Sequence, residues 1–187
     1  HNKYSILFKF IFFLRYFFGF FFISFVLFLS TPYFFDFKKK DEIIKDYLLK
    51  DYDLKLQKYE NIEYKSLPIP NLEIHNANIQ IGKKSIVINV KQLSIYPKLL
   101  NIYNFENFQT TKIILDNSEI IIKDTDLKIL GKYIYNLKKK LSLRKLDLKI
   151  NSVNTKLINL KEINFSNFGY NKNLFKGKLL NKNFKIS

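Results

Sequence analysis

The sequence predicts an α+β protein, mostly β, in which a single N-terminal transmembrane helix precedes a curved antiparallel β-sheet. We expect this sheet to form an open groove and to carry one or two short helices. Three observations predict the fold: residues 16–35 are uncharged, apolar residues recur at every second position from Asp53, and short turn-like segments separate the alternating runs. Parallel strands need crossovers of a dozen or more residues, so closely spaced strands favour antiparallel pairing.

The same observations divide the chain into three parts. Residues 1–35 are predicted to form an N-terminal tail and a transmembrane anchor, and residues 36–52 a juxtamembrane helix. Residues 53–187 are predicted to form the antiparallel β domain, which we expect to be truncated at its C-terminal end.

Residues 16–35 are long enough to cross the hydrocarbon core, about 30 Å, as a helix. Pro32 would end this helix, because proline cannot continue the hydrogen-bond ladder. A cleaved signal peptide would have a shorter apolar region and a small-x-small cleavage motif, and a buried core helix rarely needs an apolar circumference. Lysines flank the run on both sides, so the positive-inside rule alone does not set its orientation. The predicted anchor residues are Tyr16, Phe17, Phe21, Phe25 and Leu29.

The period of the apolar residues changes along the remainder of the chain. Residues 41–50 have helical spacing with acidic residues in the first turn, which favours a short amphipathic helix. Period-two runs then follow, with turns predicted at residues 82–84 and 116–118. Residues 125–140 return to helical spacing, and further strands are predicted over residues 146–150, 157–165 and 174–186.

Three segments resemble a known family, and they follow the anchor and the short helix in a fixed order. They are Tyr52-Asp53-Leu54-Lys55-Leu56, then Tyr64-Lys65-Ser66-Leu67-Pro68-Ile69-Pro70-Asn71-Leu72-Glu73-Ile74-His75-Asn76-Ala77-Asn78-Ile79, then Val90-Lys91-Gln92-Leu93-Ser94-Ile95-Tyr96-Pro97-Lys98-Leu99-Leu100 leading into residues 105–120. In this order they resemble the N-terminal region of AsmA-like proteins of Gram-negative bacteria. The resemblance covers most of residues 1–125.

The resemblance implies a single-pass protein of the bacterial inner membrane, with its N-terminus in the cytoplasm and its bulk in the periplasm. AsmA-like proteins are similar to bridge-like lipid-transfer proteins, whose antiparallel sheet has an apolar inner face. The implied function is phospholipid transport between the inner and outer membranes, within outer-membrane biogenesis. Family members usually have several hundred residues, so we expect these 187 residues to be the membrane-proximal start of a longer bridge.

Nine alternating apolar residues are predicted to line the groove, because residues at every second position of a strand project from one face. They are Leu54, Leu56, Leu72, Ile74, Ile79, Ile81, Ile86, Ile88 and Val90. The expected partners are phospholipid acyl chains, with other envelope proteins as a second class. The alternative is that the helices at 41–50 and 125–140 cover this face as a dry core. The protein would then be a membrane-anchored assembly or scaffold protein that transfers no lipid.

The sequence does not predict an enzyme, a cofactor or a metal site. The chain has no Cys and two His, and we interpret His75 as an exposed polar side chain on a strand. The carboxylate pairs Glu60/Glu63 and Asp124/Asp126 are interpreted as helix caps or solvated side chains.

The formal net charge of +16 is concentrated in residues 127–187, which contribute +13. Such a segment could meet anionic lipid headgroups or nucleic acid. However, Lys, Asn, Ile, Phe and Tyr dominate the whole chain, as AT-rich codon usage would produce. We therefore expect no specific nucleic-acid partner, and a membrane-bound nucleic-acid binder is the third hypothesis.

Overall fold

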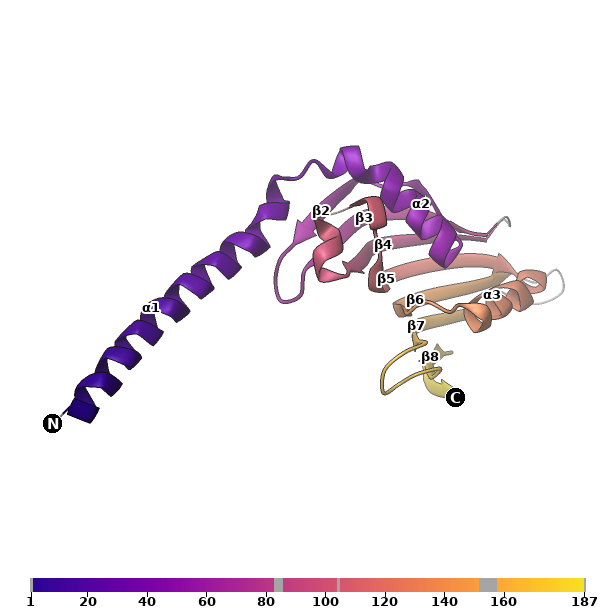
Figure 1. Cartoon of the computed structure of the whole chain (residues 1–187). Helices are drawn as coiled ribbons and strands as arrows, with labels where there is room; N and C mark the ends of the chain where they lie inside the picture. The colour runs from indigo at the N-terminus through magenta and orange to yellow at the C-terminus, as the bar shows by residue number, and fades with distance from the viewer. Residues whose placement is uncertain (1, 83–85, 104, 152–157, 187) are drawn as a thin grey trace. The chain divides into compact units, whose positions relative to one another are not determined.

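The computed structural model describes residues 2–82, 86–103, 105–151 and 158–186 (Figure 1). The chain divides into two compact units, His1–Phe35 and Asp36–Ser187.

The first unit contains the helix α1 (Asn2–Ser30) and the 3₁₀ turn η1 (Thr31–Phe34). Its segment Phe8–Phe34, 27 residues, is long and apolar enough to cross a membrane. Four predicted anchor residues, Tyr16, Phe17, Phe21 and Phe25, are exposed, and Leu29 is half-buried. At its end the Ser30 and Thr31 hydroxyls donate back to the carbonyls of Val26 and Leu27, and η1 follows with Pro32 in its first turn. α1 therefore ends next to Pro32, as the sequence predicted.

The second unit consists of a sheet with helices and 3₁₀ turns (Figure 1). Its helical elements are η2 (Phe37–Lys40), α2 (Asp41–Tyr52), η3 (Leu99–Ile102), η4 (Phe105–Asn107) and α3 (Asp124–Asn136). Its strands are β1 (Leu54–Lys58), β2 (Asn61–Lys65), β3 (Asn71–Ile81), β4 (Ile86–Pro97), β5 (Thr110–Lys123), β6 (Leu141–Asn151), β7 (Ile158–Ser166), β8 (Phe175–Leu179) and β9 (Lys182–Ile186). The predicted combination of an N-terminal apolar helix, a large open sheet and a few short helices is confirmed.

Over the described residues the sheet has nine strands in the order β1-β3-β4-β5-β6-β7-β8-β9, with β2 also paired to β3. All pairs are antiparallel except β5 and β6, which are parallel. The expectation of a purely antiparallel sheet was therefore wrong at one junction. The reason is that α3 and the residues after it form a connection long enough for a crossover.

Two further boundaries differ from the sequence prediction. Residues 116–118 are not a turn, because β5 continues through them. Residues 174–186 form the β8–β9 hairpin, which turns at Leu180 and Asn181 with positive φ angles, rather than one strand. The turn predicted at 82–84 begins at Gly82 with φ 60°, and its other two residues lie outside the described part of the chain.

A row of four exposed residues crosses the middle of the sheet at one height, and we call it the offset row. Asn76 of β3, Lys91 of β4, Asn117 of β5 and Lys145 of β6 each fall between two paired positions: the β3–β4 register skips Asn76 and Lys91, the β4–β5 register skips Lys91 and Asn117, and the β5–β6 register skips Asn117 and Lys145. On β3 the buried positions are 72 and 74 before the row and 77, 79 and 81 after it. In β4, β5 and β6 the buried positions likewise switch between even and odd residue numbers at the offset row. The offset therefore keeps the apolar residues of both halves on one face of the sheet.

Three members of the offset row have left-handed backbone conformations. Their φ angles are 49° for Asn76, 50° for Asn117 and 49° for Lys145. Where β6 pairs with β7, side-chain oxygens accept hydrogen bonds from backbone N–H groups of the irregular segments. Asn164 Oδ1 accepts from the Lys145 N–H at 3.2 Å, and Asp147 Oδ1 accepts from the Glu162 N–H at 3.0 Å. Asparagine tolerates this conformation better than β-branched residues do, which explains its presence at two of the positions.

The first prediction concerns Asn117. Replacement by Val should lower the free energy of unfolding by about 1–2 kcal/mol, because a β-branched side chain is strained at positive φ. Asn117→Gly should be nearly neutral. Lys91→Val, at the neighbouring position without positive φ, is the matched control and should cost less than about 0.5 kcal/mol. Urea unfolding of the full chain in mild detergent, followed by circular dichroism, measures all three. Equal losses for the two Val variants would contradict the strain argument.

Candidate functional site

The nine residues predicted to line the groove share one face of the sheet, and all are buried. Leu54 and Leu56 lie on β1, opposite Ile81 and Ile79 of β3. The remaining predicted residues continue the same face across β3 and β4. Each of the nine side chains is at most 5% exposed, so the face is closed to solvent in this structure.

The helix α2 covers this face. Its residues Ile44, Tyr47, Leu48 and Tyr52 are buried, α2 contacts β1, and its two tyrosines reach Thr110 at the start of β5. The predicted helix at 41–50 thus packs against the sheet, as the dry-core alternative requires. Contact between the nine residues and acyl chains stays a prediction.

A buried hydroxyl network fixes the C-terminal end of α2. Tyr52 Oη and Thr110 Oγ1 lie 2.8 Å apart, and the Thr110 N–H donates to Tyr47 Oη at 3.0 Å. Tyr133 of α3 donates its hydroxyl to the Tyr52 carbonyl at 2.7 Å. The network therefore joins α2, β5 and α3.

Burial also affects the tyrosines of this network. Loss of solvation raises the pKa of the Tyr52 hydroxyl, although its hydrogen bond to Thr110 opposes part of the shift. Loss of solvation likewise raises the pKa of the Tyr133 hydroxyl well above that of a free tyrosine. Both side chains therefore stay neutral hydrogen-bonding groups at physiological pH, not acids or bases.

A cavity of about 650 Å³ lies between the end of α2 and α3, and we call it the α2–α3 cavity. Its apolar lining includes Tyr52, Ile81, Ile129, Tyr133 and Leu137. Lysines and two aspartates form its polar part, and one of these lysines, Lys139, pairs with Asp51 at 2.7 Å. Ile81 is also one of the nine predicted groove residues, so the buried apolar face reaches an open cavity at this position.

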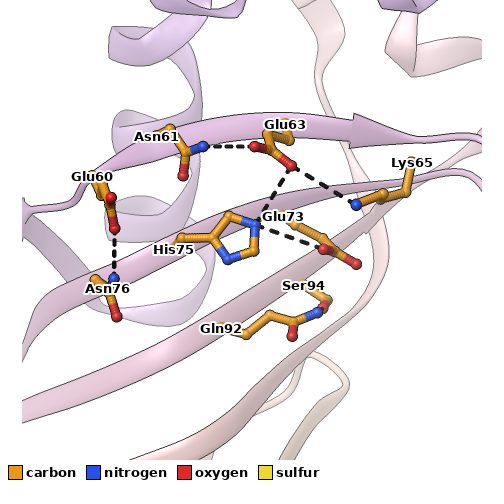
Figure 2. A network of polar contacts seen from close by, with 9 residues as sticks. All are labelled: Glu60, Asn61, Glu63, Lys65, Glu73, His75, Asn76, Gln92 and Ser94. Atoms are coloured by element: carbon orange, nitrogen blue, oxygen red, sulfur yellow. Dashed lines mark hydrogen bonds and ion pairs between the residues drawn. The ribbon is translucent and has the colours of Figure 1, made fainter.

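Polar side chains gather on the opposite face of the sheet (Figure 2). His75 Nε2 lies 3.7 Å from a Glu63 carboxylate oxygen and 3.8 Å from one of Glu73, and Glu63 also pairs with Lys65. His75 is half-buried among these partners rather than exposed, which corrects the sequence interpretation. Its neighbours are strand-paired residues, and this explains the partial cover.

The carboxylate pairs serve local structure. Glu60 accepts a hydrogen bond from the Asn76 amide, Glu63 accepts one from Asn61, and Asp124 accepts one from the Thr125 N–H at the start of α3. Within the described residues no group of three or more His, Cys, Asp or Glu side chains is arranged to hold a metal ion.

No protein-family model, curated protein or solved structure matches the chain. The AsmA-like resemblance therefore stays a prediction that rests on the order of the three sequence segments.

Sequence reasoning missed the hydroxyl network and the α2–α3 cavity. Tyr47 and Tyr52 have helical spacing, but nothing in the sequence pairs them with Thr110, 58 or more residues away. Thr110 reaches α2 from the start of β5, and Lys139 reaches Asp51 of α2 from the segment that follows α3.

The second prediction concerns Thr110. Thr110→Val should lower the free energy of unfolding by about 1–3 kcal/mol, because the buried Tyr52 hydroxyl loses its close partner. Adding Tyr52→Phe should recover part of that loss, since the unpaired hydroxyl is removed as well. The matched control is Thr111→Val at the exposed next position, which should cost under about 1 kcal/mol. Strictly additive Thr110 and Tyr52 effects in urea unfolding would contradict the coupling.

The third prediction concerns alkaline pH. The raised tyrosine pKa values mean that the folded chain keeps phenol protons that the unfolded chain loses above about pH 10. This contribution to stability is thus fully present below about pH 10 and is lost as the pH rises. In Tyr133→Phe the unfolding free energy should fall less steeply above pH 10, whereas Tyr135→Phe, at an exposed position, should follow the wild type. The test is urea unfolding across the alkaline range. Identical slopes for Tyr133→Phe and wild type would refute the assignment.

Proposed function

We propose that the chain is a membrane-anchored lipid-handling protein of the cell envelope, of the AsmA-like type. In this proposal α1 anchors it in the bacterial inner membrane with the N-terminus in the cytoplasm. The sheet lies in the periplasm and takes part in phospholipid transport between the inner and outer membranes, within outer-membrane biogenesis.

One observation supports this proposal best: the apolar face of the sheet ends in an open, largely apolar cavity at Ile81. The volume of the α2–α3 cavity, about 650 Å³, lies within the range typical of small-molecule sites, about 300–1,000 Å³. Each acyl methylene buried there would contribute about 0.8 kcal/mol, so a few methylenes suffice to hold part of a chain. Lysines also line the cavity, and Asp51 and Asp53 offset part of their charge.

In this proposal the lipid is first held in the α2–α3 cavity rather than on the nine predicted groove residues. The nine predicted residues are buried, and displacing α2 from the sheet would expose the buried side chains of Ile44, Leu48 and Tyr52. An acyl chain can instead enter the α2–α3 cavity without moving the helix. We therefore place the lipid beside the covered face rather than on it.

The second candidate function is a membrane-anchored assembly or scaffold protein with a dry core. The burial of all nine predicted groove residues favours it, because a sheet packed by its own helix needs no lipid. The two functions differ in whether the purified chain carries lipid.

The fourth prediction tests the proposal with Ile129, a half-buried residue of the α2–α3 cavity. Ile129→Asp should lower the phospholipid that co-purifies with the full chain by about fivefold or more, since a carboxylate disfavours acyl chains there. The matched control is Ile121→Asp on the exposed side of β5, which should retain lipid within about twofold of wild type. Lipid per mole of detergent-purified protein is measured by mass spectrometry.

A wild-type chain without bound phospholipid would contradict lipid handling and favour the scaffold function. Equal lipid loss in both Asp variants would remove the α2–α3 cavity as the binding place.

A further inference from the structure

A second cavity, of about 710 Å³, lies on the other side of α3, and we call it the α3–β8 cavity. Its apolar floor is formed by Ile134, Leu137, Phe165 and Phe175. The rings of Phe165 and Phe175 stack with centroids 4.4 Å apart. Leu137 lines both this cavity and the α2–α3 cavity, so the two lie next to each other.

The charge lining this cavity has one sign. Among the described residues Lys138, Lys140 and Lys172 line it and no Asp or Glu does; Lys138 also lines the α2–α3 cavity. None of the three forms an ion pair with a residue that the structure describes. The α2–α3 cavity differs, because Asp51 and Asp53 lie among its lysines. The α3–β8 cavity therefore combines an apolar floor with three lysines that form no ion pair with a described residue.

The backbone that carries two of these lysines is fixed. The Asn167 amide donates to the carbonyls of Leu137 at 3.2 Å and Lys139 at 2.7 Å, and its oxygen accepts from the Leu141 N–H at 2.8 Å. The Ile113 N–H also donates to the Lys140 carbonyl at 3.0 Å. The cavity rim is thus positioned before any ligand arrives, which reduces the ordering cost of binding.

We infer that the α3–β8 cavity binds a phospholipid with a net negative headgroup. Its phosphate lies among Lys138, Lys140 and Lys172, and part of an acyl chain lies on the half-buried floor residues Ile134, Leu137 and Phe175. This inference rests on the proposed lipid handling and adds selectivity for headgroup charge.

The charge and burial of the lining residues favour an anionic phospholipid over a zwitterionic one and over nucleic acid. A zwitterionic headgroup would bring its own cation towards the three ammonium groups, whereas an anionic headgroup carries none. Single-stranded nucleic acid binds by stacking bases on exposed aromatic faces. Phe165 is buried and its ring face is taken by Phe175, so a base cannot stack on it. Tyr135 also lines the cavity and is exposed, and the oligonucleotide outcome below tests whether a base stacks there.

Photo-crosslinking of the full chain in phosphatidylcholine nanodiscs tests the inference. The discs contain a small fraction of photoactivatable phosphatidylglycerol or, separately, photoactivatable phosphatidylcholine. Labelling is quantified on peptides covering residues 131–140 and 165–175. We expect phosphatidylglycerol to label these peptides about fivefold or more above phosphatidylcholine, because each lysine near the headgroup adds to anion attraction. High salt should reduce this preference.

One set of variants removes positive charge from the cavity, and a second set fills its space. Lys138→Gln/Lys140→Gln/Lys172→Gln should reduce phosphatidylglycerol labelling to the phosphatidylcholine level. The control Lys55→Gln/Lys58→Gln/Lys91→Gln changes net charge equally at exposed positions elsewhere and should leave the preference within about twofold.

Gly131 lines the cavity, and a Cβ there would meet no atom within 4 Å. Gly131→Leu should therefore fold, since Leu is also a better helix former than Gly, and should reduce labelling by both lipids about fivefold. Gly131→Ala, the matched small side chain, should retain most labelling.

The outcomes distinguish the two proposals. Equal labelling by both lipids, or equal loss in the two lysine triples, would overturn the anionic selectivity while leaving lipid handling intact. Absence of labelling by either lipid, together with absence of co-purified phospholipid, would overturn both. Salt-sensitive oligonucleotide binding that is lost in the cavity triple, without lipid labelling, would assign the cavity to nucleic acid instead.

Discussion

The offset row is the constraint on which the rest of the sheet depends. A strand that alternated without interruption would place Leu72 and Ile74 on one face and Ala77 and Ile79 on the other. Because β3, β4, β5 and β6 all shift at the same height, their registers stay matched and their apolar residues stay together. Strands of 11 to 14 residues can therefore share one apolar face despite the change of parity.

That continuous face explains how α2 is held. The helix needs apolar cover along its buried side, and the sheet supplies it from β1 to the start of β5. The two hydroxyls of Tyr47 and Tyr52 then meet Thr110, so polar atoms at the edge of the core find partners instead of being buried alone. Tyr133 extends the same network to α3, and the Asp51–Lys139 pair adds a contact at the surface.

Much of this architecture could be predicted from the sequence, and the failures have physical causes. Period-two runs and the helical spacing at 41–50 identify elements, because burial of one face imposes those periods. The same logic misplaced a turn at 116–118, since Asp116-Asn117-Ser118 has turn chemistry and here the left-handed Asn117 lies inside a strand. Pairing of β5 with β6 depends on how α3 docks, and no local pattern encodes that docking. Both cavities were missed for the same reason, because their walls come from residues far apart in the chain, up to 89 positions for Lys50 and Lys139 of the α2–α3 cavity.

The parallel β5–β6 pair connects the fold to the proposed chemistry. To enter β6 in the same direction as β5, the chain must return along the sheet, and α3 makes this return over the apolar face, where Tyr133 meets α2. A single helix cannot fill the width between α2 and β8, so space remains on both of its sides. The return segment then ends in three consecutive lysines beside that space. A tight antiparallel hairpin between β5 and β6 would have left no helix, no cavities and no reason for those lysines to lie beside apolar side chains. Among the described strands, the parallel β5–β6 pair is thus what produces the features that suit a charged lipid.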